Sequence, residues 1–309
     1  MTDTLARARG FLYRHARPLD LARFRYHFEQ GTREAVLRAL AAYQNPDGGF
    51  AHALEPDAWN PHSSPIQTWA ATELLREIGF SDSAHPMVQG ILRYLASGAD
   101  TAGDYWLNCV PSNNDYPHAP WWEASPTEDV THNDNPTACL AGFALRHAPH
   151  DSSLWANAHR IAVALAHAYL AQEPLQDMHR ALCYVRLLQY AQESGGVPGI
   201  DLPALQAKQQ QQVTACLSPD IARWETDYVC KPSQFFSDTA SCFYPPNAAL
   251  AAQECAFIIR TQQPDGAWPI PWRWHAYPEE WAITKLWWKA NGAVLNLLYL
   301  RGMGGMVEA

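Results

Sequence analysis

Apolar residues recur at helical spacing along most of this chain, and the alternation typical of strands is nearly absent. Val36, Leu37, Leu40 and Tyr43, for example, fall on one face of a helix. Further helices are predicted near residues 152–171, 176–193, 203–217, 246–261 and 281–300. The pattern therefore predicts an all-α protein.

One helix start is especially well marked. Ser64 is expected to be the N-cap, Pro65 suits the first helical position, and Gln67 completes a capping box. The helix is expected to stop at Gly79. Its apolar spacing predicts an inward face made of Ile66, Trp69, Ala70 and Leu74.

Two stretches far apart in the chain are near-copies of each other. Residues 37–50 read LRALAAYQNPDGGF and residues 255–268 read CAFIIRTQQPDGAW, so that Gln44 and Gln262 hold the same place. A weaker copy, without the Gln, covers residues 91–106. Helical hairpins that cannot bury their faces alone must stack, and a closed ring of them leaves no exposed end.

Composition limits the possible functions and partners. The net charge is −9, with 22 basic and 31 acidic residues and no dense Lys/Arg run, so nucleic acid and anionic membrane surfaces are not expected as partners. The sequence shows neither a signal-peptide core nor a run long enough to span a bilayer. Seven scattered cysteines without a CxxC pair indicate reduced thiols, which predicts a cytoplasmic protein.

Two long loops, at residues 98–134 and 222–246, interrupt the helices. Loops longer than about 15 residues are uncommon unless they are functional. Both are rich in proline and aromatic residues, unlike a linker, so a single domain over residues 1–309 is predicted. Asn135-Pro136 gives a second helix-start signal directly after the first loop.

The spacing of Gln, Gly and an aromatic residue after an apolar helix resembles the QW repeat of squalene–hopene cyclases and related terpenoid cyclases. Residues 44–50 and 262–268 match it in register. The wider chain resembles a bacterial group within the terpenoid cyclase and protein prenyltransferase superfamily. The segments that carry this likeness are 43–57, 114–122, 135–145 and 263–272.

The resemblance implies an (α/α)6 toroid, with six inner helices around a central cavity and six outer helices. In that family the repeat is structural, which implies that Gln44 and Gln262 tie helix ends to loops and are not catalytic. The cavity would be lined by aromatic and apolar side chains and would take a hydrophobic small molecule, with an isoprenoid as the candidate.

The motifs that define the known activities of that superfamily are missing. The sequence contains neither the Asp-x-Asp-Asp acid motif nor the Asp-Asp-x-x-Asp metal motif. The zinc set of prenyltransferases is approached by Asp238, Cys242 and His275, but with the wrong Asp–Cys spacing. His residues also lack HExxH spacing, so neither a metal nor a cofactor is predicted.

Carboxylates near helix starts are the candidate catalytic acids. Glu55 and Asp57 follow the first repeat, and a carboxylic acid kept protonated by an apolar surround could act as a general acid. Asp134 directly precedes a helix, and the nearby His132 could tune this carboxylate. For Glu55 and Asp57 the alternative is a structural one, in which the two loop carboxylates cap helices or pair with Arg. For Asp134 the alternative is turn formation, because Asn, Asp and His beside a proline are good turn formers.

Two segments rich in aromatic residues are the candidate ligand contacts: a first aromatic string, Tyr116 to Trp122, and a second aromatic string, Trp272 to Tyr277. Two prolines hold the first string rigid, and rigid loops with aromatic and His residues often face a ligand. In this string His118 is also a candidate catalytic residue. Arg273, in the second string, could bind a carboxylate or phosphate. The predicted substrate-binding residues are Tyr116, Trp121, Trp122, Trp69, Trp272, Arg273, Trp274 and His275.

Three functions fit these features. The first is an enzyme that runs acid-initiated cyclisation or isomerisation of an isoprenoid from Glu55, Asp57 or Asp134. The second is a carbohydrate-active hydrolase or lyase on the same toroid, which would use carboxylates and aromatic platforms. The third is a binding protein that retains the fold without catalysis. A closed aromatic cavity with one buried acid would favour the isoprenoid enzyme. A pair of carboxyl groups across an open groove would favour the carbohydrate-active enzyme.

Overall fold

The computed structural model describes residues 2–125, 134–175 and 177–304. In this part the chain forms eleven α-helices, several 3₁₀ turns and one short hairpin, which confirms the all-α prediction. The helices are α1 Thr2–His15, α2 Pro18–Phe28, α3 Arg33–Ala41, α4 Pro65–Glu77, α5 Pro86–Ala96, α6 Asp134–His147, α7 Ser153–Ala171, α8 Met178–Glu193, α9 Leu202–Cys216, α10 Tyr244–Thr261 and α11 Pro278–Gly302. The hairpin strands are β1 Thr101–Ala102 and β2 Tyr105–Trp106, and the 3₁₀ turns are η1 Pro111–Asp115, η2 Pro120–Trp122, η4 Ile221–Trp224 and η5 Pro232–Gln234.

Helices α7 to α11 begin and end within three residues of the predicted stretches. Helices α1 and α2 were not predicted, and buried charged residues explain the case of α2. Asp20 and Arg23 are almost fully buried within it, and Arg23 donates to Asp20 Oδ1 at 2.9 Å and to Asn291 Oδ1 at 2.7 Å. Charged residues therefore occupy positions where a pattern search expects apolar ones.

The contacts of the chain divide into two compact units. One comprises residues 41–212, and the other, here the terminal unit, comprises residues 1–40 together with 213–309. The single domain expected from the sequence stays a prediction.

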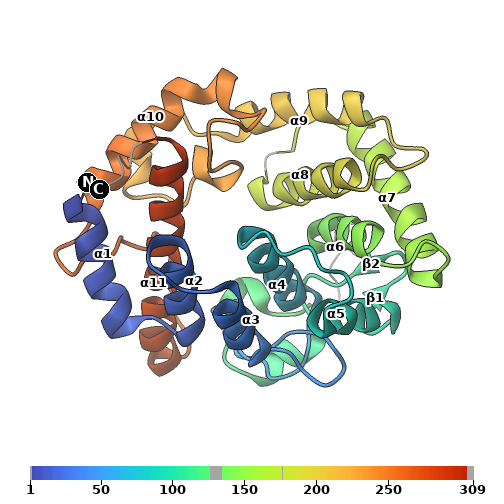
Figure 1. Ribbon diagram of the computed structural model, residues 1–309, viewed down its shortest axis with the longest axis horizontal. Coiled ribbons are helices and arrows are strands. Elements are labelled where there is room, and N and C mark those ends of the chain that lie inside the picture. Colours follow the sequence, from blue (N-terminus) through green and yellow to red (C-terminus); the bar gives the residue numbers. More distant parts are fainter. Residues whose placement is uncertain (1, 126–133, 176, 305–309) are drawn as a thin grey trace. The chain divides into compact units, whose positions relative to one another are not determined.

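In the 41–212 unit, α6 is the helix on which the others pack. It contacts α4, α5, α7 and α8 (Figure 1) and is buried along nearly its whole length. Ala138, Ala141 and Ala144 are fully buried, and a Cβ added at Gly142 would lie 3.0 Å from the Tyr190 ring. Small residues thus let α8 approach α6 closely.

In the terminal unit, the first and last helices of the chain pack together. Helix α11 contacts α1, α2 and α10, and Figure 1 shows the blue and red helices side by side. Segments from opposite ends of the sequence therefore share one core.

The two repeats make the same side-chain contact. Gln44 Nε2 donates to Gly48 O at 2.9 Å and to Met87 O, in α5, at 3.0 Å. Gln262 Nε2 donates to Gly266 O at 2.8 Å and to Thr4 O, in α1, at 2.9 Å. Helix α1 therefore supplies the backbone acceptor for the glutamine of the second repeat, as α5 does for the glutamine of the first repeat.

The glycine of each repeat is required by the same close approach. Gly48 has φ +99°, and a Cβ there would lie 2.0 Å from Gly90 O in α5. Gly266 has φ +97°, and a Cβ there would lie 2.1 Å from Arg7 O in α1. Each loop thus packs its backbone directly on the backbone of a helix.

Helix α4 starts at the predicted N-cap, but Gln67 does not complete a capping box, because Ser64 N donates to Phe50 O and not to the Gln67 side chain. The helix also buries a different face from the one predicted. Ser64 Oγ accepts from Gln67 N at 3.3 Å, which confirms the N-cap. Of the residues predicted to face inward, Ile66 is buried whereas Trp69, Ala70 and Leu74 are only half-buried. The buried face carries Gln67, Thr68, Ala71, Thr72 and Leu75.

Two polar residues of this face explain the difference. Gln67 Oε1 accepts from Glu55 N at 3.1 Å, and Gln67 Nε2 donates to Ala58 O at 2.9 Å. Thr68 Oγ1 accepts from Phe50 N at 3.1 Å. Both side chains turn inward because the loop before α4 supplies backbone groups that need hydrogen-bond partners.

The weak third copy, residues 91–106, does not form the repeat loop. It contains the end of α5 and the antiparallel hairpin of β1 and β2, with Gly103 at φ 60° in its turn. The Gln that ties the other two loops to a helix is missing here. Trp106, in β2, is instead fixed to α6, because its N donates to Thr137 Oγ1 at 3.0 Å.

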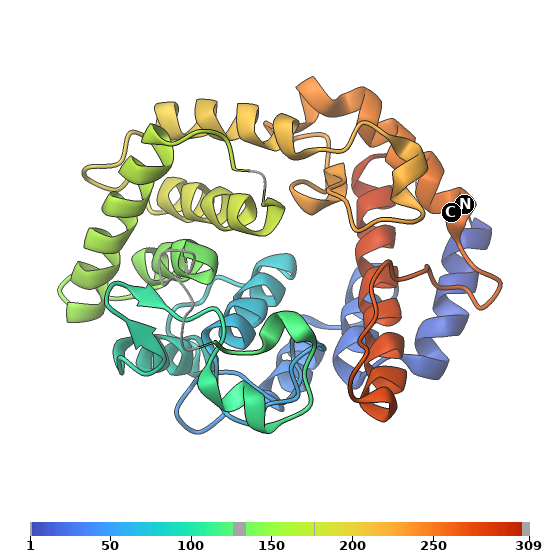
Figure 2. The same cartoon turned by 180° about the vertical axis from the view of Figure 1, so that it is seen from behind.

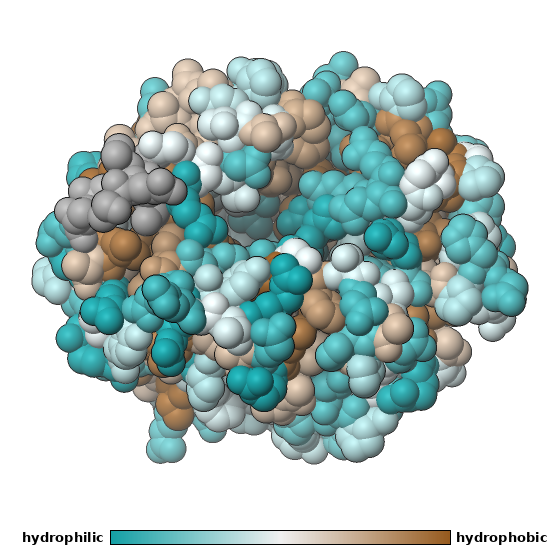
Figure 3. Space-filling view, viewed as in Figure 1, coloured by the Kyte–Doolittle hydropathy of each residue, from teal (hydrophilic) through white to brown (hydrophobic). Residues whose placement is uncertain are grey.

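The visible surface in Figure 3 mixes hydrophilic and hydrophobic residues, as expected for helices that bury one face. No helix among the described residues is long and apolar enough to cross a membrane.

The close approach at the second repeat predicts opposite effects for two glycine substitutions in the terminal unit. Gly266→Ala should lower the free energy of unfolding by at least about 1 kcal/mol, because φ is positive and the new Cβ meets Arg7 O. Gly292→Ala, on α11 with open space around its Cβ, should raise it by about 0.5–1 kcal/mol. Urea denaturation of both variants measures this; a Gly266→Ala variant as stable as the parent would contradict the packing.

Candidate functional site

Two loop segments singled out by the sequence lie against each other in the 41–212 unit (Figure 2). Trp59 N donates to Pro117 O at 2.9 Å, and Ala119 N donates to Asp57 O at 2.8 Å. These bonds form an antiparallel bridge between Ala58 and His118. The structure thus brings the loop of Glu55 and Asp57 together with the first aromatic string.

Buried asparagines strengthen this contact. Asn60 and Asn113 are only 1% and 4% exposed. Asn60 Nδ2 donates to Ser112 Oγ at 2.8 Å and to Asn113 Oδ1 at 2.9 Å, and Asn113 Nδ2 donates to Trp122 O at 3.0 Å. A buried and mutually bonded set of this kind fixes one arrangement of the two loops.

The two candidate acids of this loop have different surroundings. Asp57 is buried, with 2% of its surface exposed, whereas Glu55 is half-buried. Glu55 Oε2 accepts a hydrogen bond from Asp57 N at 2.9 Å, and Glu55 N is held by Gln67 of α4. Glu55 thus closes the turn in which Asp57 sits, and Asp57 is the more deeply placed carboxyl.

His118 has a defined tautomer. It is 9% exposed, and its Nδ1 lies 2.6 Å from Tyr116 O. A carbonyl oxygen only accepts, so Nδ1 carries the proton, and in the neutral ring Nε2 is the acceptor nitrogen. This orientation is the one that a histidine base requires.

The aromatic residues of this region are exposed to different degrees. Trp121 is 45% exposed, while Tyr116, Trp122 and Trp69 are half-buried. The Tyr116 hydroxyl lies 3.3 Å from His62 Nε2. Within the described ranges, the buried indole nitrogens of Trp69 and Trp122 have no hydrogen-bond acceptor.

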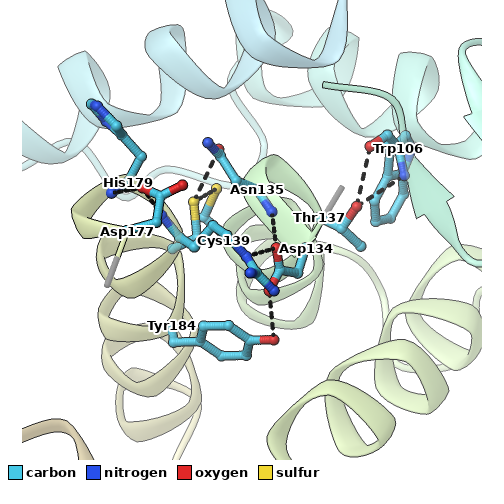
Figure 4. A network of polar contacts seen from close by, with 10 residues as sticks. Trp106, Asp134, Asn135, Thr137, Cys139, Asp177, His179 and Tyr184 are labelled. Carbon is cyan, nitrogen blue, oxygen red and sulfur yellow. Dashed lines mark hydrogen bonds and ion pairs between the residues drawn. The ribbon is translucent and has the colours of Figure 1, made fainter. Parts of the chain in front are cut away.

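Asp134, the third candidate acid, is part of an ion pair (Figure 4). Arg180 contacts both carboxylate oxygens, with Nε to Oδ1 at 2.7 Å and Nη2 to Oδ2 at 2.8 Å. The Tyr184 hydroxyl donates to Oδ2 at 3.1 Å, and Asn135 N donates to Oδ1 at 3.0 Å. All of these partners donate, so the site suits an ionised carboxylate and not a proton donor.

The groups around Asp134 respond to its charge. The hydrogen bonds to Asp134 raise the pKa of Arg180 above its usual value. Burial, and then the Asp134 charge, raise the pKa of Tyr184. The pair joins α6 to α8, which gives Asp134 a structural role. His132, expected to tune this carboxylate, lies outside the described residues.

The second aromatic string belongs to the terminal unit. Trp272 packs edge-on against Tyr228 and Trp288, with ring centroids 5.3 and 5.2 Å apart. Trp274 is buried at 2% exposure, whereas Arg273 and His275 are exposed. Trp274 is therefore a core residue of this unit, and the exposed Arg273 and His275 remain candidates for a ligand contact.

The sequence reasoning missed a depression beside the first repeat. It has a volume of about 440 Å³ and is open to solvent. Its lining comes entirely from the 41–212 unit and is mostly polar: Asn45, Pro46, Asp47, Pro61, His62, Ser63, Asp100 and Ser112. Polar groups converging on a concave surface are typical of ligand sites.

Two carboxylates face this depression. Burial raises the pKa of Asp100, and the negative charge of Asp47 raises it further. Asp100 also has φ 53°, a strained backbone for a residue with a side chain. The repeat pattern indicates a structural role for Asp47, and Asp100 lies in the degraded third copy, so the sequence predicts neither of them as a site residue.

Within the described ranges, no group of three or more His, Cys, Asp or Glu side chains could hold a metal ion. Comparisons of the chain with protein-family models, curated proteins and solved structures find no match.

The burial of Asp134 predicts that its partner is needed for stability. Arg180→Ala should lower the free energy of unfolding by about 3 kcal/mol or more, because it leaves Asp134 buried and unpaired. Arg160→Ala is the matched control: the Arg160–Asp104 pair also has two hydrogen bonds but is exposed, so its loss should cost at most about 1 kcal/mol. Equal effects of the two substitutions in urea denaturation would contradict the structural role of Asp134.

Proposed function

We propose that the chain is an (α/α)6 toroid of the terpenoid-cyclase-like kind. The matched hydrogen bonds of Gln44 and Gln262 support this proposal, since both tie a repeat loop to an early residue of another helix. The second repeat uses α1, from the opposite end of the chain. A series of repeats whose last member is completed by the first helix has no exposed end, as a ring requires.

We further propose that the protein is an enzyme that starts a cyclisation or isomerisation by protonating a hydrophobic, isoprenoid-type substrate. The observation that carries this proposal is the buried Asp57 carboxyl, held in a loop that is hydrogen-bonded to the His118 segment. A carboxyl withdrawn from water is the group that alkene protonation needs. Among the three predicted acids, Asp134 fits this role least, because Arg180 neutralises it.

The proposed reaction needs a proton donor, aromatic faces that stabilise a cation, and a base that removes a proton. Asp57 would give its proton to an alkene carbon, which forms the new C–H bond and leaves a carbocation on the neighbouring carbon. The faces of Trp69, Trp121 and Trp122 are candidates for stabilising that cation. His118, whose Nδ1 is committed to Tyr116 O, would take a proton from an adjacent carbon through Nε2 and so restore an alkene.

The test is incubation of the purified protein with squalene, farnesyl diphosphate and geranylgeranyl diphosphate, followed by gas chromatography and mass spectrometry of the extracts. Asp57→Asn should reduce the rate of product formation by about 10²- to 10⁴-fold, the usual contribution of a general acid. Glu123→Gln, an exposed acid beside the aromatic string, is the control and should leave the rate unchanged.

Two results would count against this function. One is the absence of any product from all three substrates with folded protein. The other is a product that Asp57→Asn forms at the parental rate, which would leave Asp57 without a catalytic role.

A further inference from the structure

The two repeats place an aspartate in the same turn. Asp47 Oδ1 accepts from Gly49 N at 2.9 Å, and Asp265 Oδ1 accepts from Ala267 N at 3.0 Å. One carboxylate oxygen of each residue therefore holds the loop, and the other is available for a different contact. The two copies differ in what that second oxygen meets.

In the second repeat the second oxygen meets an ammonium group from the chain itself. Lys289 Nζ, on α11, donates to Asp265 Oδ2 and, at 2.9 Å, to Gln263 Oε1. The same nitrogen lies over the Phe11 ring, 5.4 Å from its centroid. The Lys289 ammonium group is thus bound by a carboxylate, an amide oxygen and an aromatic face, which are all groups that favour a cation.

In the first repeat the corresponding residues are Asn45, Asp47 and Tyr94. The glycine of the first repeat approaches Gly90 in α5, and the glycine of the second repeat approaches Arg7 in α1. Tyr94 lies four residues after Gly90, and Phe11 lies four residues after Arg7, so Tyr94 and Phe11 hold the same place. The acidic, amide and aromatic positions are therefore conserved between the two copies of the loop.

The first repeat has no counterpart of the Lys289 ammonium group among the described residues. Asp47 Oδ1 takes both hydrogen bonds, from Gly49 N and from Ser63 Oγ at 2.8 Å, so within the described ranges Oδ2 has no partner. No Lys or Arg is among the residues that line the depression. The nearby Arg93 donates to Pro46 O and not to the carboxylate.

A second carboxylate takes part at this position. The Tyr94 hydroxyl donates to Asp100 Oδ2 at 2.7 Å, which fixes Asp100 at the edge of the depression. Burial raises the pKa of Asp100 most, the hydrogen bond from Tyr94 lowers it, the negative charge of Asp47 raises it, and His62 lowers it, so Asp47 and Asp100 repel each other. A cation between them would relieve this repulsion.

We propose that the depression beside the first repeat binds the ammonium group of a small amine, which takes the place that Lys289 holds in the second repeat. Asp47 Oδ2 and Asp100 are its acceptors. The Asn45 amide oxygen is already bonded to His52 Nε2 at 2.9 Å, so the two carboxylates provide the charge recognition. A volume of about 440 Å³ leaves room for the body of an amine of sugar size. This site is independent of the acid chemistry proposed at Asp57.

The test is isothermal titration calorimetry of the full chain with two amines and their neutral counterparts. The probes are 1,4-diaminobutane against 1,4-butanediol, and glucosamine against glucose. Both amines should bind, both neutral molecules should bind at least about tenfold more weakly, and added salt should weaken amine binding because the site is open to solvent.

Two substitutions and a control assign the effect to the depression. Asp47→Asn keeps the oxygen that accepts from Gly49 N and Ser63 Oγ, and Asp100→Asn keeps an acceptor for Tyr94. Each should weaken amine binding by about tenfold, the value of one charge-assisted hydrogen bond. Asp115→Asn removes the same charge from an exposed residue outside the depression and should leave affinity unchanged. Thermal unfolding checks that all three variants are folded.

Three outcomes would overturn the proposal. Glucose and butanediol could bind as tightly as the amines, which would favour the carbohydrate alternative. Asp115→Asn could weaken binding as much as Asp47→Asn, which would indicate attraction by net charge alone. Amine binding could also be absent from the folded parent protein.

Discussion

The side-chain amide of one glutamine in each repeat is the interaction on which the arrangement of the loops depends. Gln44 and Gln262 each donate one bond within their own loop and one to another helix. Removing such an amide would leave two backbone carbonyls without their partner, at a cost of about 1–3 kcal/mol for each buried group. The same bonds bring each repeat glycine onto a helix backbone and aim each repeat aspartate outward from its turn.

Buried polar groups extend this arrangement to the candidate site. Gln67 and Thr68 of α4 hold the backbone of the loop that follows the first repeat, and Asn60 and Asn113 join that loop to the next one. Each of these side chains supplies a buried backbone or amide group with the hydrogen-bond partner that water would otherwise provide. The position of Asp57 near His118 is thus a consequence of hydrogen bonding more than of apolar packing.

The sequence predicted the helices well where an apolar stripe faces one core, as in α7 to α11. It failed where charge or hydrogen bonding replaces that stripe. In α2 a buried ion pair of Asp20 and Arg23 breaks the apolar pattern. In α4 Gln67 and Thr68 occupy the buried face because nearby loop groups need partners.

The candidate site was predicted in part. The loops of Glu55 and Asp57 and of Tyr116 to Trp122 were singled out from composition, and the structure brings them together. The pairing of Asp134 with Arg180 could not be seen, because it joins residues 46 positions apart in the sequence. Asp47 escaped notice because a residue that holds a turn through one oxygen can still present the other to a ligand.

Native-state hydrogen exchange of the full chain tests the central claim most directly: that α1 completes the second repeat as α5 completes the first. In Gln262→Ala, amides of residues 262–268 and of α1 should exchange faster together, while residues 44–50 and α5 keep their protection. In Gln44→Ala the pattern should be reversed. Unchanged protection of α1 in Gln262→Ala, or equal loss at both repeats in either variant, would contradict the account.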